Sequence, residues 1–487
     1  MSCPMSLATL LEGWCDTPPA VTISGLTLDS RSVRPGDAFL AVAGTHTHGL
    51  SFAAEAQARG ARLIIHDGLA NIPRLEIPAV RVEGLGRLLS RMAARFFHAP
   101  SDQLTIAGVT GTNGKTSTAH FIAQAWQRTS GKAGLIGTIG YGALPRLRKA
   151  ELTTPDAVSV QRMLSECIDE GVDSVAMEVS SHALEQGRCA DVAFDAGVFT
   201  NLSRDHLDYH ASMAQYAAAK RRLFTDCQPR FAVINADDEF GRSLIAELKG
   251  RAEVLSYGTN GSSELRAGVL EMDASGMALN ITSPWGQGKL HAALLGRFNV
   301  SNLMAAAGTL ALLGMPWSQV MHQLELMRPV PGRMHCLGGE HDQPLVVVDF
   351  AHTPDALKQA LTALRAHLHG RLTCVFGCGG DRDRGKRPMM AAVAESLADR
   401  VVVTSDNPRS EAPQDIFRDM LAGMRSPTDA VVISDRAAAI RQAILESNSG
   451  DIVLVAGKGH ETWQESNGQR VPFSDEAEVR AVLEAAA

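Results

Sequence analysis

Residues 104–117 read Leu-Thr-Ile-Ala-Gly-Val-Thr-Gly-Thr-Asn-Gly-Lys-Thr-Ser, and this stretch decides the kind of fold that the chain forms. Its apolar, β-branched beginning is typical of a buried strand, its glycines indicate a tight turn, and residues 119–127 favour a helix. A strand, a glycine-rich turn and a helix in this order predict a phosphate-binding loop, in which backbone N–H groups and the helix dipole hold phosphate. We expect Lys115 to reach the outer phosphates and Thr116 to bind Mg²⁺. Val109 replaces the first glycine of G-x-x-x-x-G-K-[ST], so the motif is the shortened G-x-x-G-K-T. The alternative is a glycine-rich turn with a solvated lysine.

Composition limits the classes of protein to which the chain can belong. Its 487 residues are typical of roughly three domains. The net charge is −7 with scattered basic residues, so we expect no polyanion-binding face, and 5% aromatic residues disfavour a stacking platform for nucleic acid. Partners should therefore be small molecules.

The eight cysteines are too sparse for a disulfide framework, and only Cys374 and Cys378 lie close together in the sequence. No second pair completes a zinc site, so reduced thiols of a cytosolic protein are expected. No signal peptide and no apolar run of membrane-spanning length are visible. We expect a soluble, cytoplasmic protein without membrane insertion.

Three domains are predicted, with boundaries at Pro100-Ser101 and at the rigid segment 329–333. Residues 1–100 alternate short strands and helices, including a strand over 21–28, and indicate a small α/β domain. Residues 101–333 contain the phosphate loop and mostly parallel strands, with short antiparallel strands over 252–295. Residues 334–487 have the βαβα pattern of a doubly wound sheet.

Polar residues follow several predicted strands of the second domain. Glu178 ends a strand and suits the carboxylate that a phosphate loop needs for its metal, although Ser180 and Ser181 also fit a capped helix start. His206 and His210, at i and i+4, could share a helix face and bind zinc, or lie in a solvated loop; beside a nucleotide site, we favour one as a Mg²⁺-side or phosphate-side group. Taken by itself, the sequence around Lys220 indicates only the basic end of a helix.

The third domain has charged residues where ligands bind in such sheets. Residues 381–387, the turn Asp406-Asn407-Pro408-Arg409 and the segment 457–461 each follow a predicted strand. Arginine binds carboxylates in a bidentate manner, and a carboxylate can bind an amine. The pattern indicates a pocket for a small molecule that carries carboxylates and amines, although each segment alone also fits a solvated loop or turn.

Five separated motifs, in the right order, resemble the Mur ligases, the ATP-dependent amide-forming enzymes of bacterial cell-wall synthesis. They are residues 111–117, 178–182 (Glu-Val-Ser-Ser-His), 201–208 (Asn-Leu-Ser-Arg-Asp-His-Leu-Asp), 298–302 (Phe-Asn-Val-Ser-Asn) and 349–355 (Asp-Phe-Ala-His-Thr-Pro-Asp). This family itself uses the shorter phosphate loop. The resemblance implies a UDP-binding N-terminal domain, a central ATPase-type domain and a Rossmann-like C-terminal domain.

The resemblance also implies the roles of individual residues. Lys115, Glu178, His206 and Lys220 would be catalytic, and the metal ligands would be Thr116, Glu178, His206 and Lys220, the last as a carbamate. ATP would be bound by Gly111, Thr112, Asn113, Gly114, Lys115, Thr116, Ser117, Asn299, Asn302, Arg333, Asp349 and His352. The UDP-linked muramoyl-dipeptide would be bound by Leu28, Ser30, Thr45, His46, Thr47, Thr153, Thr154, Ser180, Gln186 and Arg188. Diaminopimelate would be bound by Arg382, Asp406, Asn407, Pro408, Arg409, Gly457 and Glu461. Leu152 departs from the pattern, since a polar residue is expected there.

The activity implied by the resemblance is that of an ADP-forming ligase with ATP and Mg²⁺ as cofactors, and we expect a monomer. It would add meso-diaminopimelate to the D-glutamate side-chain carboxylate of a UDP-N-acetylmuramoyl-dipeptide through an acyl phosphate. Two alternatives stay open: a folylpolyglutamate-synthetase-like ligase, and a P-loop regulatory or GTP-binding protein. The first is disfavoured by residues 28–31 and the N-terminal domain. The GTPase form of the second is disfavoured because the sequence has no N-K-x-D motif.

Overall fold

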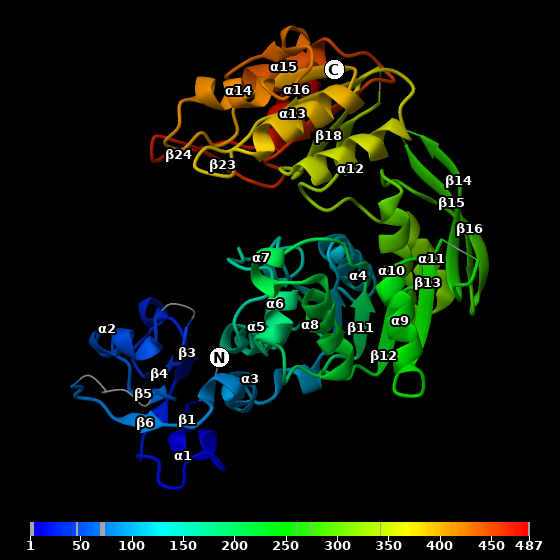
Figure 1. The fold of residues 1–487 in the computed structure, drawn as a ribbon. Coiled ribbons are helices and arrows are strands. Elements are labelled where there is room, and N and C mark those ends of the chain that lie inside the picture. The colour runs from blue at the N-terminus through cyan, green and yellow to red at the C-terminus, as the bar shows by residue number, and fades with distance from the viewer. Residues whose placement is uncertain are drawn as a thin grey trace. The chain divides into compact units, whose positions relative to one another are not determined.

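The computed structural model describes residues 4–44, 47–68, 74–259, 261–273, 275–340 and 342–485. The chain forms two compact units. One consists of Met1–Tyr257 with Gly308–Met315, and the other of Gly258–Ala307 with Pro316–Ala487. Each unit has hydrophobic cores of its own, and the elements of both units are labelled in Figure 1.

The phosphate-loop strand lies inside the main sheet of the first unit. In this sheet β10 and β11 pair with β7 on either side, in parallel. The strand order is β13-β12-β11-β7-β10-β8-β9. The strands are β7 (Thr105–Thr110), β8 (Ala133–Ile136), β9 (Tyr141–Ala143), β10 (Ser174–Glu178), β11 (Ala196–Phe199), β12 (Phe231–Asn235) and β13 (Glu253–Gly258). The central strands β7, β8, β10, β11 and β12 are largely buried and mainly apolar, as parallel strands are, whereas the edge strand β9 pairs with β8 in the antiparallel direction.

Helices of the same unit pack on this sheet and position its loops. They are α4 (Lys115–Ser130), α5 (Ala157–Asp169), α6 (Ser181–Glu185), α7 (Leu207–His210), α8 (Met213–Thr225) and α9 (Glu239–Leu248). One prediction was wrong here: the antiparallel pattern was expected from residue 252, but β13 pairs in parallel with β12. Alternation in so short a strand did not distinguish the two pairings.

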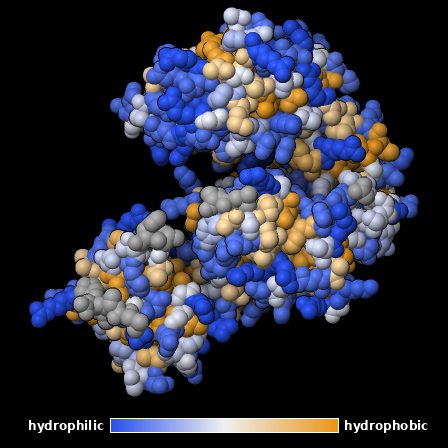
Figure 2. Space-filling model, in the orientation of Figure 1, coloured by the Kyte–Doolittle hydropathy of each residue, from blue (hydrophilic) through white to orange (hydrophobic). Residues whose placement is uncertain are grey.

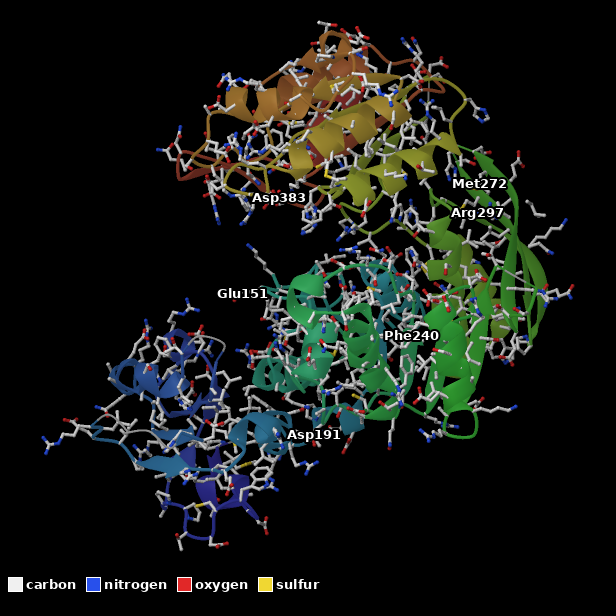
Figure 3. All side chains as sticks on the ribbon, viewed as in Figure 1. Glu151, Asp191, Phe240, Met272, Arg297 and Asp383 are labelled. Atoms are coloured by element: carbon white, nitrogen blue, oxygen red, sulfur yellow. The ribbon has the colours of Figure 1, made fainter. Side chains whose placement is uncertain are left out.

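The beginning of the chain forms a smaller sheet in the order β3-β4-β5-β6, all parallel, and an antiparallel pair β1-β2. Its strands are β1 (Met5–Ser6), β2 (Thr22–Ile23), β3 (Gly25–Thr27), β4 (Asp37–Ala41), β5 (Leu63–His66) and β6 (Ala79–Arg81), and its helices are α1 (Leu7–Leu10), α2 (Ala53–Ala58) and α3 (Leu85–Phe96), with 3-10 turns at Ser30–Ser32, Gly49–Phe52 and Pro100–Gln103. The single strand predicted over 21–28 is in fact two, because the chain changes partner at Ser24, whose N–H donates to Gly36 O. Helix α3 is joined to Asp191, labelled in Figure 3, through Arg91 Nε (2.9 Å) and Ser90 Oγ.

The second unit begins with antiparallel strands, as predicted from the sequence. These are β14 (Leu265–Asp273), β15 (Gly276–Ser283) and β16 (Gly286–Ala292), in that order, with a bulge between Val269 and Glu271. Helix α10 (Phe298–Leu312) follows, of which the residues up to Ala307 belong to this unit, and then α11 (Trp317–Glu325). Trp317 stacks on Trp285 of the β15–β16 turn, with ring centres 5.6 Å apart.

The rest of the second unit is a doubly wound sheet in the order β17-β18-β22-β19-β20-β21, parallel except for β17. Its strands are β17 (His335–Gly338), β18 (Leu345–Asp349), β19 (Leu372–Phe376), β20 (Arg400–Val403), β21 (Val431–Val432) and β22 (Ile452–Ala456). Helices α12 (Pro354–Arg365), α13 (Lys386–Leu397) and α14 (Pro413–Leu421) pack in the core of one face. Helices α15 (Arg436–Leu445) and α16 (Asp475–Ala485) pack in the core of the other (Figure 1).

A hairpin, β23 (Trp463–Ser466) with β24 (Gln469–Pro472), and a 3-10 turn at Pro427–Asp429 complete the described elements. The fold class predicted from the sequence is confirmed: parallel α/β sheets, a small antiparallel sheet and a doubly wound C-terminal sheet. On the face shown in Figure 2, the surface is mostly hydrophilic with small hydrophobic areas. Within the described part of the chain, no helix combines the length and apolarity needed to cross a bilayer.

Candidate active site

The loop between β7 and α4 has the geometry of a phosphate-binding loop. Gly111 has φ +151°, and a Cβ there would lie 1.8 Å from Thr200 Oγ1, so only glycine fits. Gly114, with φ +83°, precedes the first turn of α4, which begins at Lys115. The N-terminal N–H groups of this helix therefore point at the end of the loop, where an anion is favoured.

The segment after β11 holds this loop in shape. Thr112 N donates to Asn201 O (2.8 Å), and Asn113 N donates to Asn201 Oδ1 (2.9 Å). Thr200 Oγ1 donates to Asn113 O at 2.6 Å, and Ser203 N donates to Thr112 Oγ1 at 3.0 Å. Residues 200–203 thus fix the backbone that would surround the phosphates, a role that the sequence did not reveal for Thr200.

Two lysines converge on the carbonyl of Gly111. Lys115 Nζ donates to Gly111 O at 2.9 Å and to Thr112 O at 2.8 Å. Lys220 Nζ donates to Gly111 O at 2.7 Å and lies 4.3 Å from the ring centre of Tyr216. Lys220 lies on α8 and its side chain is buried, so it is not the solvated end of a helix. Burial lowers the pKa of its amine well below the usual value, the nearby Lys115 lowers it further, and Asp205 opposes the shift.

Glu178, at the end of β10, brings oxygen atoms together beside the loop. Thr116 Oγ1 donates to Glu178 Oε2 at 2.8 Å, and the N–H of Thr138 donates to Oε1 at 2.7 Å. A Cβ on Gly137 would lie 2.3 Å from Oε1, so the chain approaches the carboxylate closely. A buried carboxylate next to a threonine hydroxyl is an all-oxygen pair of the kind that Mg²⁺ prefers. The residues present therefore fit this ion.

His206 and His210 occupy different environments, which does not support the alternative in which they share a helix face. Helix α7 is a single turn, and His206 precedes it with φ +51°. The His206 ring is exposed, 5.1 Å from His182 and 6.0 Å from Tyr216, whose hydroxyl donates to Thr112 Oγ1. His210 is buried, with Nε2 2.9 Å from Ser181 Oγ. Among the described residues, no group of three or more His, Cys, Asp or Glu side chains is arranged to hold a metal, and a zinc site has no support there.

The residues predicted to hold the peptide lie around Glu178. Thr153 Oγ1 is 3.0 Å from Thr138 Oγ1, and Thr154 Oγ1 donates to Glu178 O and accepts from Ser180 N, both at 2.9 Å. Ser180 also caps α6, so the two alternatives for this segment coexist. Arg188 donates to Gln186 Oε1 and to Thr154 O. Leu152, the departure noted above, is 52% exposed beside this group.

The residues predicted to hold UDP lie in the N-terminal sheet region. Ser30 Oγ donates to Glu55 Oε2 at 2.7 Å, and Leu28 packs against the core there. Thr47 O accepts from Gly44 N. Thr45 and His46 lie outside the described residues.

In the second unit, an aromatic cluster follows β18. The guanidinium carbon of Arg333 lies 5.1 Å from the ring centre of Phe350, and His352 and His460 lie 4.5 and 5.3 Å from that ring. Asp349 is buried and accepts from the N–H groups of Met334 and Ala351. Burial raises the pKa of this carboxyl, and Arg333 partly offsets the shift. On α10, Asn299 Nδ2 donates to Leu295 O and Asn302 Nδ2 to Asn299 Oδ1.

A second cluster, the amino-acid cluster, lies at the carboxyl ends of β20 and β22. Asn407 Nδ2 donates to Glu461 Oε2 at 2.9 Å, and Lys458 Nζ donates to the same oxygen at 2.8 Å and to Asn407 Oδ1 at 3.1 Å. Gly457 has φ +116°, and a Cβ there would lie 2.8 Å from Asp406 Oδ2. Burial raises the pKa of Asp406, while Arg436 and Lys458 oppose the shift.

Arg409 lies next to this cluster, and Pro408 before it is buried. The backbone of Arg409 has φ +52°, and the guanidinium of this residue donates to Gly380 O at 2.8 Å. Arg382 is exposed on the loop between β19 and α13, near the Asp383 labelled in Figure 3. The predicted solvated loop 381–387 is solvated only in part, because Arg387 is fully buried and binds Glu411 and Asp419.

Family models match the chain in the order of its parts. The model "Mur ligase family, catalytic domain" matches residues 22–97, "Mur ligase middle domain" matches 109–310, and "Mur ligase, glutamate ligase domain" matches 332–459. The chain belongs to the Mur ligase family.

Relatives within this family are similar over nearly the whole length. A UDP-N-acetylmuramoyl-L-alanyl-D-glutamate–2,6-diaminopimelate ligase of Pseudomonas putida is 48% identical over 475 residues, 95% of each chain. The ligase of the same name from Pseudomonas aeruginosa is 47% identical over 485 residues, 99% of each chain. A solved structure of a ligase with this name matches with a TM-score of 0.74 and 36% identity, over 99% of each chain.

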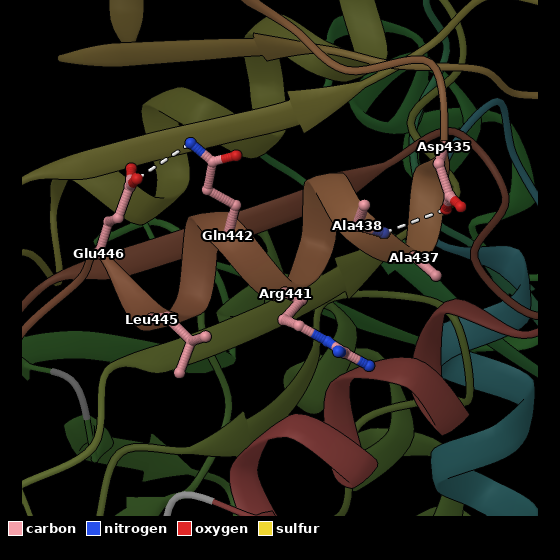
Figure 4. Close-up of a pocket in the computed structure, with 7 residues that line it drawn as sticks. All are labelled: Asp435, Ala437, Ala438, Arg441, Gln442, Leu445 and Glu446. Atoms are coloured by element: carbon pink, nitrogen blue, oxygen red, sulfur yellow. Dashed lines mark hydrogen bonds between the residues drawn. The ribbon is translucent and has the colours of Figure 1, made fainter.

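One hollow in this Mur ligase lies apart from the residues described above. It has a volume of about 440 Å³ and runs along α15, where it is lined by Asp435, Ala437, Ala438, Arg441, Gln442, Leu445 and Glu446 (Figure 4). Asp435 caps the helix and Gln442 donates to Glu446, so these polar groups are already paired. A helix surface without convergent polar groups lacks the character of a catalytic pocket.

Proposed function

We propose that this Mur ligase joins meso-diaminopimelate to the D-glutamate side-chain carboxylate of UDP-N-acetylmuramoyl-L-alanyl-D-glutamate, with conversion of ATP to ADP and phosphate. The observation that carries the proposal is the amino-acid cluster at the carboxyl ends of β20 and β22, in which a carboxylate, an amide and a lysine are joined by hydrogen bonds, with Arg409 next to them in the chain. The names of relatives about 48% identical over the whole chain agree with it.

The first unit supplies the phosphate chemistry in this proposal. The loop from Gly111 to Ser117 holds the phosphates of ATP, and Lys115 exchanges its backbone contacts for the outer phosphates. Thr116 and Glu178 hold Mg²⁺, with His206 and a carbamate on Lys220 as further ligands. When bound, this ion neutralises charge on the phosphates. In the second unit, Asn299, Asn302, Arg333, Asp349 and His352 are the proposed nucleotide residues.

The reaction needs a carboxylate to become a good acyl donor. The D-glutamate side-chain carboxylate attacks the γ-phosphorus of ATP, the bond to ADP breaks, and an acyl phosphate forms. An amine of diaminopimelate then attacks the acyl carbon, and the tetrahedral intermediate expels phosphate with loss of a proton from nitrogen. Transfer of a phosphoryl group involves little covalent chemistry by the protein, so positioning and neutralisation of charge provide most of the catalysis.

The peptide-binding residues are suited to bring that carboxylate to the loop. Thr154 donates directly to Glu178 O, and Ser180 N donates to Thr154 Oγ1. Thr153 is linked to Glu178 through Thr138. We propose that Arg188, with Gln186, holds a carboxylate of the dipeptide, and that Leu28, Ser30 and the segment 45–47 hold the UDP part.

Recognition of the amino acid follows from charge. An amine held as an ammonium between carboxylates has no free electron pair, so it is not the nucleophile. The cluster of Asp406, Asn407, Glu461 and Gly457 therefore holds the end of diaminopimelate that does not react. Arg409, with Arg382, pairs with the carboxylate at the non-reacting end of diaminopimelate. L-Lysine lacks that carboxylate, so it should bind more weakly.

Use of ATP favours a cytoplasmic reaction. We propose that the protein acts there as a monomer.

The test is phosphate release measured with one component omitted at a time. We expect release from ATP only when the UDP-linked dipeptide and meso-diaminopimelate are both present, with an amide-linked product of matching amount. Release with neither substrate would favour the P-loop regulatory alternative. Release that needs a folate and glutamate would favour the folylpolyglutamate-synthetase-like alternative.

A further inference from the structure

Lys458 is a fully buried lysine that the proposed reaction does not use. It lies in the turn after β22, between Gly457 and Gly459. Its side chain has 0% exposure, and the ring of Trp463 covers it at 5.5 Å. Burial of a lysine is costly unless its charge is balanced and its protons are bonded.

The partners of this lysine are the amino-acid-binding residues themselves. Lys458 Nζ donates to Glu461 Oε2 and to Asn407 Oδ1, and Asn407 Nδ2 closes the triangle by donating to the same Glu461 oxygen. Asp406 Oδ1 lies 3.9 Å from Nζ. Asn407 Oδ1 also accepts from Glu465 N, which fixes the orientation of the amide.

This arrangement leaves one face of Glu461 for a ligand. Oε2 accepts two hydrogen bonds, while Oε1 has no hydrogen-bond partner in the described part of the chain, and the side chain is 24% exposed. Lys458 is buried behind the carboxylate and is not itself exposed. A ligand ammonium would therefore meet Oε1.

Charge gives a second reason for a lysine here. Asp406 and Glu461 carry up to two negative charges, and Lys458 balances one of them. The remaining charge of about −1 matches a single ammonium group, as one end of an amino acid provides.

Arg436 supports the cluster from the protein interior. It is held by Asp475 and donates to Ser405 O and Ala456 O, which fixes the ends of β20 and β22.

We propose that Lys458 is a positioning residue for amino-acid recognition, which orients Glu461 and Asn407 and sets the net charge of their pocket to accept one ammonium group. This inference rests on the proposed function, whose amino-acid-binding residues it organises. Lys458 acts through its neighbours, since its side chain is fully buried.

The experiment uses the full chain with Lys458→Met, which removes the charge and keeps the apolar stem. The matched control is Lys358→Met on the exposed side of α12. We expect Lys458→Met to raise KM for meso-diaminopimelate at least tenfold, while KM for ATP and for the UDP-linked dipeptide change less than twofold. Because removal of one partner of a buried pair leaves Glu461 without its cation, the melting temperature should fall, and the kinetics are therefore measured at a temperature at which the variant is folded.

A pH profile adds a readout that a merely structural role would not move. Asp406 faces Arg436, Lys458, Glu461 and Asp475, and Lys458 is one of the two cations that lower its pKa. Without Lys458, Asp406 should take up a proton at higher pH. The acid limb of kcat/KM for meso-diaminopimelate should therefore move to higher pH in Lys458→Met and stay in place in Lys358→Met.

An active wild type with an unchanged KM for meso-diaminopimelate in Lys458→Met would overturn the proposal. If that variant does not fold, Lys458→Gln, which keeps a donor without charge, is measured in the same way. Failure of both variants to fold would also overturn it, because the lysine would then serve folding. If the wild type itself shows no diaminopimelate-dependent phosphate release, the proposed function fails instead, so the two failures are distinguishable.

Discussion

Arg409 shows how a strained residue can serve recognition. Its backbone has φ +52°, which costs a non-glycine residue energy, yet the N–H donates to Glu465 O and the carbonyl accepts from Asn467 N. The guanidinium donates to Gly380 O, and the side chain remains 21% exposed. Contacts at both ends thus fix the direction of the arginine and leave donors for a carboxylate.

Arg409→Ala should weaken binding of meso-diaminopimelate more than it slows the chemical step. Loss of a charged, hydrogen-bonded pair costs about 2 kcal/mol, which corresponds to about a 30-fold higher KM for this substrate. Steady-state kinetics with each substrate varied in turn provide the measurement. An unchanged KM for meso-diaminopimelate would contradict the assigned role.

Lys220 should react with carbon dioxide. Only a neutral amine forms a carbamate, and burial lowers the pKa of Lys220, so the neutral form is populated at a lower pH than for an exposed lysine. We expect protein incubated with ¹³C-bicarbonate to show a carbamate carbon signal by NMR, and Lys220→Arg to lack it. The same signal in that variant would assign the carbamate to another amine.

At the scale of elements, the ion pairs of the buried Arg387 join the loops that carry the proposed amino-acid-binding residues. Arg387 of α13 binds Glu411, which precedes α14, and Asp419 of α14. Glu411 Oε1 also accepts from Asp381 N, and Ser410 binds the Asp381 carboxylate. The loop after β19 is therefore joined to the loop after β20, which carries Arg409.

This network predicts how stability depends on pH. Arg387 holds the pKa of Glu411 at about 2, below the usual 4.5. A depressed acid stabilises the folded state above its unfolded pKa, and that contribution is lost as pH falls from about 4.5 to about 2. We expect Glu411→Gln to be less stable than the wild type at pH 7, with a smaller difference at pH 3, by urea unfolding.

The control for this comparison is Glu484→Gln, at an exposed position on α16. It should match the wild type at both pH values. A difference for Glu411→Gln that is the same at pH 7 and pH 3 would show that the Arg387 pair is not its source.

At the scale of the whole molecule, choice of the amino acid should appear in the complete reaction. With the UDP-linked dipeptide and ATP, we expect kcat/KM for L-lysine and L-ornithine to be at least about a hundredfold lower than for meso-diaminopimelate. An amino acid without the distal carboxylate leaves a guanidinium unpaired, and sites built for a polar partner reject such analogues strongly. Comparable values for all three amino acids would refute selection by Arg409.

Local patterns in the sequence predicted much of this architecture. Strand, glycine turn, Lys115-Thr116 and helix follow one another without a gap, so chain connectivity determines their order and proximity. The doubly wound C-terminal sheet was likewise visible, because buried parallel strands are apolar throughout. The sequence did not predict the break between β2 and β3 at Ser24 or the parallel pairing of β13. Both depend on which strand pairs with the segment.

The sequence by itself indicated a phosphate-binding loop, showed which polar segments follow the strands and, through its motifs, predicted the family. Only the tertiary structure decided which polar side chains are buried and which groups they contact. It buried Lys220 against Gly111 O, separated His206 from His210, and placed Lys458 behind Glu461. The physical reason is that connectivity and periodicity are local, whereas burial and charge depend on neighbours distant in the chain. Lys220 and Gly111, 109 positions apart, show this most clearly.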